Sequence, residues 1–324
     1  MTDIAMIEAA AARAVGVVRE TPLLSSPFLD EIAGRPVFAK AEVLQHTGSF
    51  KFRGGWSAVS ALDETTRAKG VIAYSSGNHA QGVARAAALH GVPSVIIMPR
   101  DAPALKIENT RALGAEVVLY DRAGGEKREA IGARLVAERG MTLIKPYDDA
   151  QVIAGQGTCG LEIAAQAAAL GVDAGTVLTC CGGGGLSAGI ALALEARAPG
   201  LRVRPVEPAG FDDTARSLAA GERVGHGSPE AGLCDAILTP MPGEITFPVL
   251  KRLCGPGIVV TELEVKEAMR LAALRLKLVV EPGGAVALAA ALFHGRALED
   301  GPVICTLSGG NADPELYAGI LAGG

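Results

Sequence analysis

The sequence predicts an α/β protein with two lobes, each built on an open, mostly parallel sheet flanked by helices. Short apolar runs alternate with longer segments of helical periodicity along most of the chain, which is the pattern of strand–helix units on a parallel sheet. The chain has 324 residues, more than one ordinary hydrophobic core accommodates, so we expect two lobes. Its 42 glycines and 4% aromatic content are typical of a compact enzyme with many tight turns.

The predicted elements follow from the N-terminus in order. Residues 5–19 have helical spacing that stops at Thr21-Pro22. The apolar runs predict strands near 37–42, 71–74, 94–98, 116–120, 141–144, 175–181, 201–207, 257–260 and 302–307. Helical spacing predicts helices near 51–62, 78–90, 103–113, 126–139, 151–170, 186–197, 264–278, 284–293 and 313–322. The proline-containing segments 199–208 and 239–256 have the composition of surface connections.

The spacing of the strands also predicts how the chain divides. The four strands between 71 and 144 are each followed by a helix, so they are able to form a small βα lobe of their own. We therefore expect a small domain over 70–146, inserted into a larger domain made of 1–69 and 147–324.

Composition and charge exclude several classes of partner. The net charge of −5 provides no positive field for nucleic acid or an anionic membrane. No apolar run reaches the roughly 18 residues of a spanning helix, and the N-terminus lacks the basic start of a secretory signal. The six cysteines show no CxxC spacing, and Cys180-Cys181 is typical of a buried strand end. We expect a cytoplasmic protein.

Lys51 is the first candidate for chemistry, because it lies between Phe50 and Phe52 where a strand pattern gives way to a helix pattern. Apolar surroundings disfavour the charged form of an amine and lower its pKa. A neutral amine attacks aldehydes, which makes Lys51 a candidate for Schiff-base formation. The alternative, a lysine whose stem passes two core rings while its amine reaches water, stays open at this point.

A glycine-rich loop, Gly182–Gly185, follows the apolar run 176–179 and precedes a predicted helix. Glycines allow the backbone to approach an anion closely, and the amides of the loop and helix start then bind it. A phosphate is the expected ligand. A dinucleotide site is an alternative, because Gly182-x-Gly184 is followed by Glu207 at the end of the next apolar run. Ser187, however, takes the place of the third glycine of that fingerprint.

Two further polar loops follow predicted strands. Ser75-Ser76-Gly77-Asn78-His79 combines small side chains with a helix start that is suited to a carboxylate, although a plain helix cap explains it equally well. Ser308 begins Ser-Gly-Gly-Asn after the last strand. All three loops would lie at the carboxyl ends of parallel strands, where open α/β sheets bind ligands.

Together these motifs resemble a known family. Ser-Phe-Lys-x-Arg-Gly, Ser-Ser-Gly-Asn-His-x-Gln-Gly, Val-Ile-Ala-Gly-Gln-Gly-Thr, Gly-Gly-Gly-Gly-Leu, Val-Glu-Pro, Glu-Pro-Gly-Gly-Ala and Ser-Gly-Gly-Asn occur in that order. They are similar to those of fold-type II pyridoxal phosphate enzymes, within the serine/threonine dehydratase and serine racemase group. The resemblance extends from residue 21 to 311 and so covers nearly the whole chain.

The resemblance implies a role for each cofactor-binding residue. Lys51 would form the Schiff base with pyridoxal 5'-phosphate, and Phe50 would pack against its ring. The phosphate would be bound by Gly182, Gly183, Gly184 and Gly185. Asn78 would hydrogen-bond the ring hydroxyl, and Ser308 would meet the pyridine nitrogen. Because a neutral hydroxyl does not keep that nitrogen protonated, elimination of a β-substituent is favoured over transamination.

The reaction implied is the dehydration of a β-hydroxy amino acid, with L-serine and L-threonine as first expectation, to a 2-keto acid and ammonia. Ser75, Ser76, Asn78 and His79 would bind the substrate carboxylate, and Lys51 would take the α-proton. Ser76 is serine as in racemase-like members, so a second proton donor opposite Lys51 makes serine or aspartate racemisation an alternative. The resemblance also implies a homodimer.

Two finer expectations also come from the resemblance. Glu207 and Asp213, with the carbonyl of Phe211, match the divalent-cation site of racemase-like members, and oxygen ligands suit Mg²⁺, Mn²⁺ or Ca²⁺. Arg128 aligns with an arginine near the substrate side chain, and a guanidinium suits a second carboxylate. A 3-hydroxyaspartate dehydratase is therefore a further alternative, with Arg53 and Lys145 as weaker candidate cations.

Overall fold

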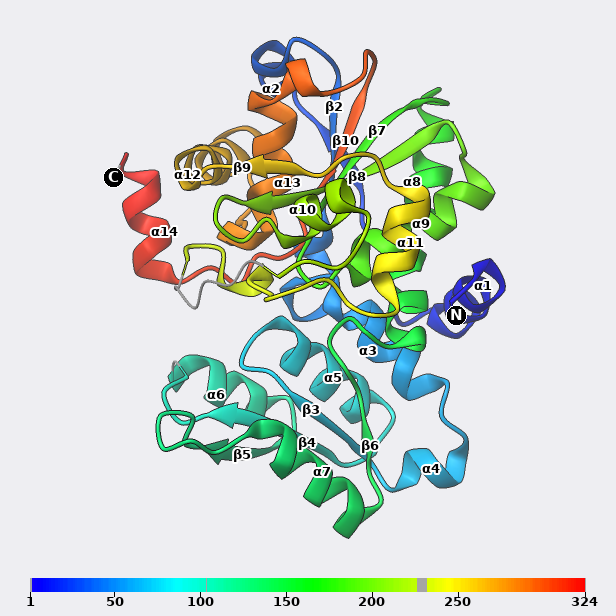
Figure 1. Cartoon of the computed structure of the whole chain (residues 1–324), viewed down its shortest axis with the longest axis vertical. Helices are drawn as coiled ribbons and strands as arrows, with labels where there is room; N and C mark the ends of the chain where they lie inside the picture. Colours follow the sequence, from blue (N-terminus) through cyan, green and yellow to red (C-terminus); the bar gives the residue numbers. More distant parts are fainter. Residues whose placement is uncertain (1, 103, 226–231, 324) are drawn as a thin grey trace.

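Two parallel sheets divide the molecule into a larger and a smaller lobe (Figure 1). The computed structural model describes residues 2–102, 104–225 and 232–323. The six-stranded sheet of the larger lobe has the order β1-β2-β10-β7-β8-β9, in which only β1 runs antiparallel to its neighbour. Its strands are β1 Leu23–Ser25, β2 Val37–Lys40, β7 Gly175–Cys180, β8 Leu201–Pro208, β9 Ile258–Val260 and β10 Val303–Thr306.

The smaller lobe has a four-stranded parallel sheet of order β5-β4-β3-β6. Its strands are β3 Val71–Tyr74, β4 Ser94–Pro99, β5 Glu116–Tyr120 and β6 Thr142–Leu143. All four come from the segment 70–146, and all six strands of the other sheet come from outside it. This predicted α/β class with two helix-flanked parallel sheets is confirmed, and the domain boundaries themselves stay a prediction.

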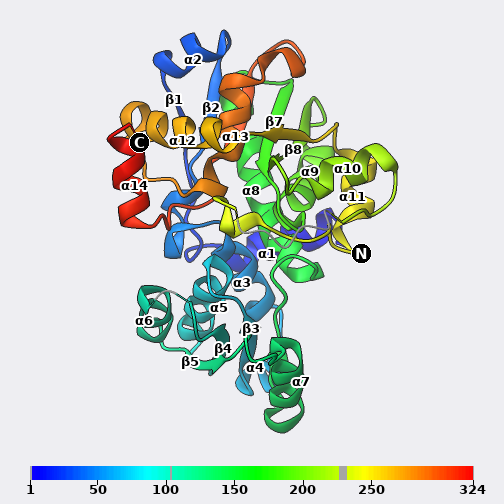
Figure 2. The same cartoon turned by 60° about the vertical axis from the view of Figure 1, so that its left-hand side comes forward.

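Helices cover both faces of each sheet (Figures 1 and 2). The α-helices are α1 Ile4–Ala14, α2 Pro27–Ala33, α3 Lys51–Ser60, α4 Glu64–Ala68, α5 Asn78–Leu89, α6 Ala104–Ala112, α7 Arg128–Arg139, α8 Ala150–Ala169, α9 Gly185–Arg197, α10 Asp213–Ala220, α11 Thr246–Leu253, α12 Glu262–Leu271, α13 Pro282–Phe293 and α14 Pro314–Leu321. Short turns of other helix types are η1 Glu42–Leu44, η2 His46–Gly48, η3 Asp235–Ile237, η4 Ala272–Leu276 and η5 Gly295–Ala297. Within the described ranges, no helix is both long and apolar enough to cross a membrane.

Several sequence predictions about elements are wrong. The first helix ends at Ala14 rather than 19, because the chain turns at Gly16 with a φ of 76°. Segment 199–208 is no surface connection: β8 is buried and pairs with strands on both sides. Segment 239–256 contains α11, since Pro248 lies in its first turn, where a missing N–H costs no helical hydrogen bond. The sequence patterns also missed β1, α2, α4 and α10.

Helix α3 is the element through which the two lobes meet. It packs on α5, which covers the smaller sheet, and on α8 of the larger lobe. At the crossing with α5, a Cβ added to Gly55 would lie 2.9 Å from the main chain of Gly82. A Cβ added to Gly82 would lie 2.9 Å from the main chain of Lys51. The two backbones are therefore in direct contact next to Lys51.

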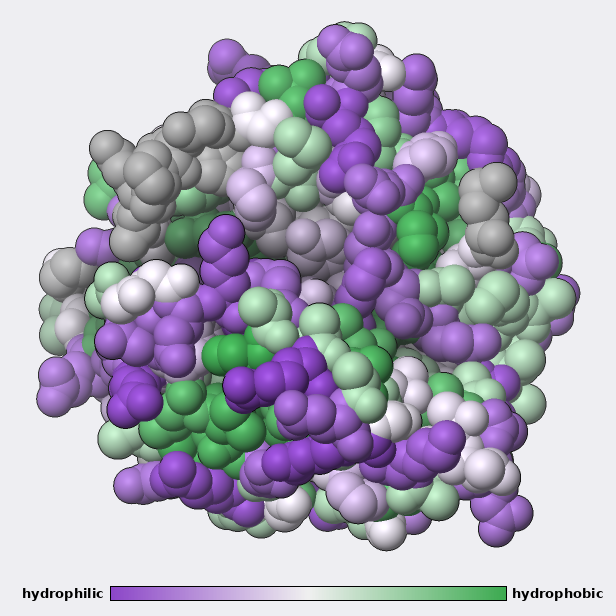
Figure 3. Space-filling view, turned by 60° about the horizontal axis from the view of Figure 1, so that its bottom comes forward, coloured by the Kyte–Doolittle hydropathy of each residue, from purple (hydrophilic) through white to green (hydrophobic). Residues whose placement is uncertain are grey.

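The surface of the smaller lobe is mixed in character. Figure 3 shows this end of the molecule, where hydrophilic side chains are interrupted by several separate apolar patches.

In the described part of the chain, all six cysteines are free and buried, as the absence of CxxC spacing had indicated. Among the described residues, the structure therefore offers neither a disulfide nor an exposed thiol.

Candidate active site

A cavity of about 290 Å³ lies between the two lobes, at the carboxyl ends of β3, β7 and β10. Three loops after strands reach it because the carboxyl ends of parallel strands lie at one edge of their sheet. The predicted cofactor and substrate residues all line this cavity: Phe50, Lys51, Ser75, Ser76, Asn78, His79, Arg128, Gly182, Gly183, Gly184, Gly185 and Ser308.

Lys51 is the first residue of α3 and faces the cavity. Its Nζ donates to the carbonyl of Pro146 over 2.8 Å and lies 5.1 Å from the centre of the Phe50 ring. Burial lowers the pKa of this amine to about 8, although the charge of Glu281 opposes the shift. Near neutral pH a useful fraction of Lys51 is therefore uncharged and nucleophilic.

The tetraglycine loop joins β7 to α9. Two residues at and just before the start of α11 hold it in place by hydrogen bonds. The carbonyl of Gly183 accepts hydrogen bonds from the Gly243 amide, at 3.2 Å, and the Thr246 hydroxyl, at 2.7 Å. Gly184 has a φ of 89°, and a Cβ on Gly183 would lie 2.2 Å from the Tyr147 ring. Side chains are therefore excluded at Gly183 and Gly184, and the loop with the start of α9 forms a cradle for an anion such as a phosphate.

The loop before α5 forms the smaller-lobe wall of the cavity. The Ser75 hydroxyl accepts from the Gly77 amide over 3.2 Å, and α5 begins at Asn78. His79 is buried, and its Nε2 lies 2.9 Å from the carbonyl of Ile144. Burial and the charge of Lys51 lower the pKa of His79 to about 3. The imidazole is therefore neutral and supplies no positive charge to a substrate carboxylate.

Asn78 is held between two side chains that sequence reasoning missed. Its Nδ2 donates to Glu281 Oε1 over 2.5 Å, and its Oδ1 accepts from Asn311 Nδ2 over 2.7 Å. Burial raises the pKa of Glu281 to about 7, since the hydrogen bond from Asn78 compensates only in part. Both missed residues belong to motifs that carried the family resemblance, Glu-Pro-Gly-Gly-Ala and Ser-Gly-Gly-Asn, which was the available signal.

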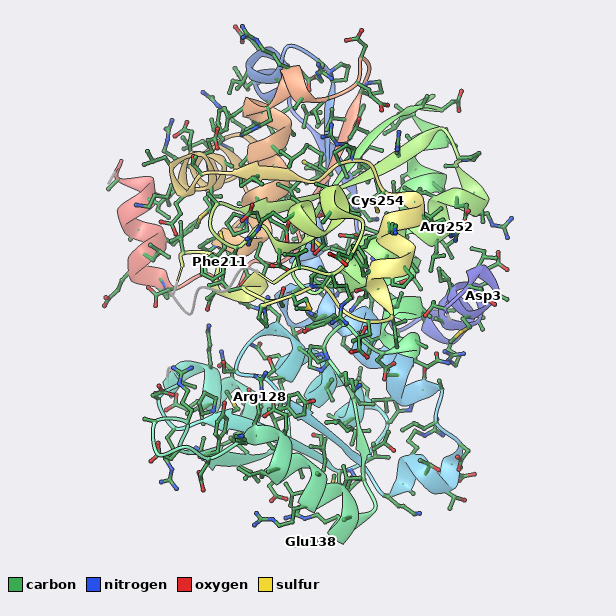
Figure 4. The ribbon with its side chains drawn as sticks, viewed as in Figure 1. Asp3, Arg128, Glu138, Phe211, Arg252 and Cys254 are labelled. Atoms are coloured by element: carbon green, nitrogen blue, oxygen red, sulfur yellow. The ribbon has the colours of Figure 1, made fainter. Side chains whose placement is uncertain are left out.

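Cations from the smaller lobe also reach the cavity. Arg128 begins α7, where its Nε bonds Glu129 over 2.8 Å and its guanidinium lies 5.1 Å from the centre of the Tyr74 ring. Figure 4 shows it on the side of the smaller lobe that faces the larger one. Lys106 of α6 lines the same cavity and was missed by sequence reasoning.

The two weaker candidate cations do not line the cavity. Arg53 is fully buried in an ionic network with Glu42 and Glu162. Lys145 is exposed. Neither is placed to bind a substrate carboxylate in this cavity.

The predicted metal ligands lie outside the cavity, in the larger lobe (Figure 4 labels Phe211). Glu207 at the end of β8 is buried and accepts from the amides of Thr214 and Ala215, at 2.9 and 2.7 Å. Burial, and then the charge of Asp213, raise the pKa of Glu207 to about 8. Among the described residues, neither carboxyl oxygen of the buried Asp213 has a hydrogen-bond partner.

The surroundings of Glu207 argue against one of its two predicted roles, whereas the metal site stays a prediction. A carboxylate buried under the first amides of α10 is not available to a ribose in the cavity, which argues against the dinucleotide alternative. Two buried carboxylates, one of them with unpaired oxygens, are an unfavourable arrangement without a proton or a cation. No cluster of three or more His, Cys, Asp or Glu side chains with metal-site geometry occurs within the described ranges. The predicted ligand set combines two carboxylates with one carbonyl oxygen, which suits a hard cation.

Several known proteins are similar to this chain in sequence and in structure. A family model described as pyridoxal-phosphate dependent enzyme matches residues 15–309. The L-threo-3-hydroxyaspartate ammonia-lyase of Pseudomonas sp is 43% identical over 314 residues, which are 97% of each chain. The T.th. threonine deaminase has 46% identity and a TM-score of 0.90, with 96% of this chain and 99% of that chain covered.

Maize serine racemase has a similar structure, with 37% identity and a TM-score of 0.91 over 99% of this chain and 97% of that chain. The resemblance seen in the sequence motifs is thus confirmed over nearly the whole chain. The chain belongs to the family of pyridoxal-phosphate-dependent enzymes of fold-type II.

Proposed function

We propose that this chain is an ammonia-lyase that converts a β-hydroxy amino acid, L-serine or L-threonine in the simplest case, into a 2-keto acid and ammonia. The observation that carries the proposal is the desolvated amine of Lys51, which shares one cavity with an anion cradle and the Ser308 hydroxyl. The activities of threonine deaminase and hydroxyaspartate ammonia-lyase relatives support it.

The residues present suit pyridoxal phosphate. Gly182–Gly185 would hold its phosphate, Asn78 its ring hydroxyl and Lys51 its aldehyde carbon, with Phe50 beside the ring. When bound, the cofactor withdraws electrons from the α-carbon of the amino acid. Ser308 would offer the ring nitrogen a neutral hydroxyl, which favours rapid loss of the β-hydroxyl group over transamination.

Groups of the protein then bind the substrate carboxylate and accept the α-proton. The loop Ser75–His79 binds the substrate carboxylate through its amides and hydroxyls, because the His79 ring stays neutral. The amine of Lys51, with its lowered pKa, takes the α-proton at Nζ. The β-hydroxyl takes up one proton, equal in number to the one removed from the α-carbon, and leaves as water. One water is then consumed when hydrolysis releases the keto acid and ammonia, so these two are the only net products.

The first experiment is chemical. Purified protein reconstituted with pyridoxal phosphate should be yellow and should release ammonia from L-serine, and Lys51→Ala should lose both the absorbance and the activity. Chiral analysis of recovered serine and aspartate tests the racemase alternative, in which Ser76 returns the proton from the face opposite Lys51. A colourless protein without ammonia release would overturn the proposal.

A second candidate substrate is 3-hydroxyaspartate, and Arg128 is the observation that favours it. A guanidinium that faces the cavity suits a second carboxylate, and the Pseudomonas relative acts on L-threo-3-hydroxyaspartate. Because a bond to a charged group contributes about 1.5–3 kcal/mol, Arg128→Ala should reduce kcat/KM for hydroxyaspartate at least about tenfold. Arg134→Ala, on the same helix but exposed and outside the cavity, is the matched control.

We also propose a divalent cation between Glu207, Asp213 and the carbonyl of Phe211. The buried, unpaired oxygens of Asp213 support it. Chelation should lower the melting temperature of the wild type, and Mg²⁺ should restore it. Asp213→Asn should be insensitive to both, whereas Asp212→Asn, whose side chain pairs with Arg216, should behave like the wild type. An unchanged wild-type melting temperature on chelation would contradict the site.

The cytoplasmic location and the homodimer predicted from the sequence stay predictions. Sedimentation of the purified protein measures its oligomeric state directly.

A further inference from the structure

Lys106 and Asp235 form a charge pair that joins the two lobes across the cavity. Lys106 belongs to α6 of the smaller lobe, and Asp235 begins η3 of the larger lobe. The Lys106 Nζ lies 3.1 Å from Asp235 Oδ2, and both residues line the cavity. Their side chains are 30% and 63% exposed. An ion pair with this much solvent contact is weak, so a ligand is able to replace one of its members.

The charges around the cavity are divided between its two walls. The smaller-lobe wall carries the cations Lys106 and Arg128, and the larger-lobe wall carries the acids Asp235 and Glu281 together with the amine of Lys51. Burial raises the pKa of Glu281, which bonds Asn78 in the same cavity; the charge of Asp235 adds to this shift, and the charge of Lys106 opposes it. Lys106 therefore lies within electrostatic range of the reaction centre, and not only at the outer rim.

Arg128 has partners from its own lobe, whereas Lys106 has a partner from the opposite lobe. Arg128 is held by Glu129 and by the Tyr74 ring, both from its own lobe. Lys106 is paired with an acid from the opposite lobe. An ammonium group has three donors that rotate freely, so it adapts to a new anion more readily than a guanidinium already stacked on a ring.

We propose that Lys106, acting beside Arg128, is a specificity-determining residue that binds the second carboxylate of a dicarboxylic β-hydroxy amino acid. Asp235 holds Lys106 when the substrate carries no such group. A substrate carboxylate takes over this contact, while serine leaves the pair intact. Asp235 also repels any anionic side chain that Lys106 does not neutralise. This inference rests on the proposed ammonia-lyase function and names the part of the site that selects among its substrates.

The test compares two substrates on two variants of the holoenzyme. Lys106→Met keeps the aliphatic stem and removes the charge. It should reduce kcat/KM for 3-hydroxyaspartate by about tenfold or more, mainly through KM, since a contact to a charged group is lost. For L-serine the loss should be clearly smaller than for 3-hydroxyaspartate, since serine carries no second carboxylate for Lys106 to bind. Arg122→Met is the control, because Arg122 pairs with Asp101 over 2.7 Å on the same lobe, outside the cavity.

The reciprocal variant separates substrate binding from lobe closure. Asp235→Asn removes the repulsion, so it should lower KM for hydroxyaspartate and leave serine unchanged. If Lys106→Met and Asp235→Asn both impair the two substrates equally, the pair is a latch between the lobes and the proposal is overturned. An unchanged substrate preference in Lys106→Met overturns it as well.

A binding measurement keeps this result independent of lyase activity. Succinate and butyrate differ by one carboxylate and do not react. Calorimetry on the holoenzyme therefore measures how much the second carboxylate adds to the binding affinity. The wild type and Arg122→Met should bind succinate more tightly than butyrate, and Lys106→Met should lose this difference. Equal binding of both acids by the wild type overturns the inference, even where ammonia release from serine supports the proposed function.

Discussion

Replacing Arg53 by methionine should destabilise the fold strongly, even though Arg53 lies only two residues from Lys51. Its side chain is fully buried. Nε and Nη2 donate to the two oxygens of Glu42 over 2.7 and 2.8 Å, and Nη1 donates to Glu162 over 2.6 Å. Methionine occupies a similar length of chain but supplies none of these donors, so the substitution tests the ionic network rather than the packing.

The expected loss follows from what remains around Glu42. The Glu42 carboxylate is fully buried, and its pKa lies below the usual value because Arg53 outweighs the effect of burial. Without Arg53, it retains the Thr21 hydroxyl at 2.5 Å and the more distant charge of Lys40. Leaving one partner of a buried ion pair uncompensated costs about 3–5 kcal/mol. The double variant Arg53→Met with Glu42→Gln removes the stranded charge and should recover about 1–2 kcal/mol of this loss.

Equilibrium unfolding in denaturant measures this free energy, and the chain provides its own probe. Its one tryptophan, Trp56, lies on the same helix as Arg53, is buried, and donates from Nε1 to the carbonyl of Arg13. Arg252→Met is the control, since Arg252 pairs with Glu195 at an exposed site, and it should change the free energy of unfolding by less than about 1 kcal/mol. A loss of under about 1 kcal/mol in Arg53→Met would refute the reasoning.

Three further outcomes are expected. Gly183→Ala should weaken binding of pyridoxal phosphate at least about tenfold, because its Cβ would lie 2.2 Å from the Tyr147 ring. Gly182→Ala, whose Cβ would lie 3.2 Å from the Ile237 main chain, should bind more nearly like the wild type in a fluorescence titration. The rate at which apoenzyme captures the cofactor should rise with pH and level off above about 8, the pKa of Lys51, because the neutral amine reacts; stopped-flow absorbance measures it, and a flat profile contradicts it. Thr261→Ala should lower stability by about 1 kcal/mol without affecting turnover, since its capping box with Glu264 lies outside the cavity.

Much of the architecture could be predicted because the strand and helix periods differ so clearly along the chain. In a parallel sheet, loops that follow the strands lie at one edge of the sheet. The loops after β3, β7 and β10 could therefore be expected to lie close together, and all three line the cavity. The elements that were missed have local reasons. Pro248 argues against a helix in the sequence, but it lies in the first turn of α11, where a proline is tolerated.

The charged residues of the site were harder to predict. Arg53 follows Lys51 by two residues, but residues two apart on a helix project about 200° apart, so Arg53 points into the core while Lys51 faces the cavity. Lys106 and Asp235 carry no motif, and only the packing of the lobes brings them together. Glu281 lies within a motif, yet nothing in its spacing indicates the bond to Asn78.

The glycine crossing of α3 and α5 has a consequence for redesigning this enzyme. At Gly55 and Gly82 the helices touch through main-chain atoms, and a backbone contact cannot be relaxed by choosing another rotamer. A larger residue at either glycine would therefore push α3 and α5 apart and change the distance between Lys51 and the loop before α5. The side chains proposed to select the substrate, by contrast, are Lys106 of α6 and Arg128 of α7. New specificities can therefore be sought on those two helices while the reaction chemistry stays unchanged.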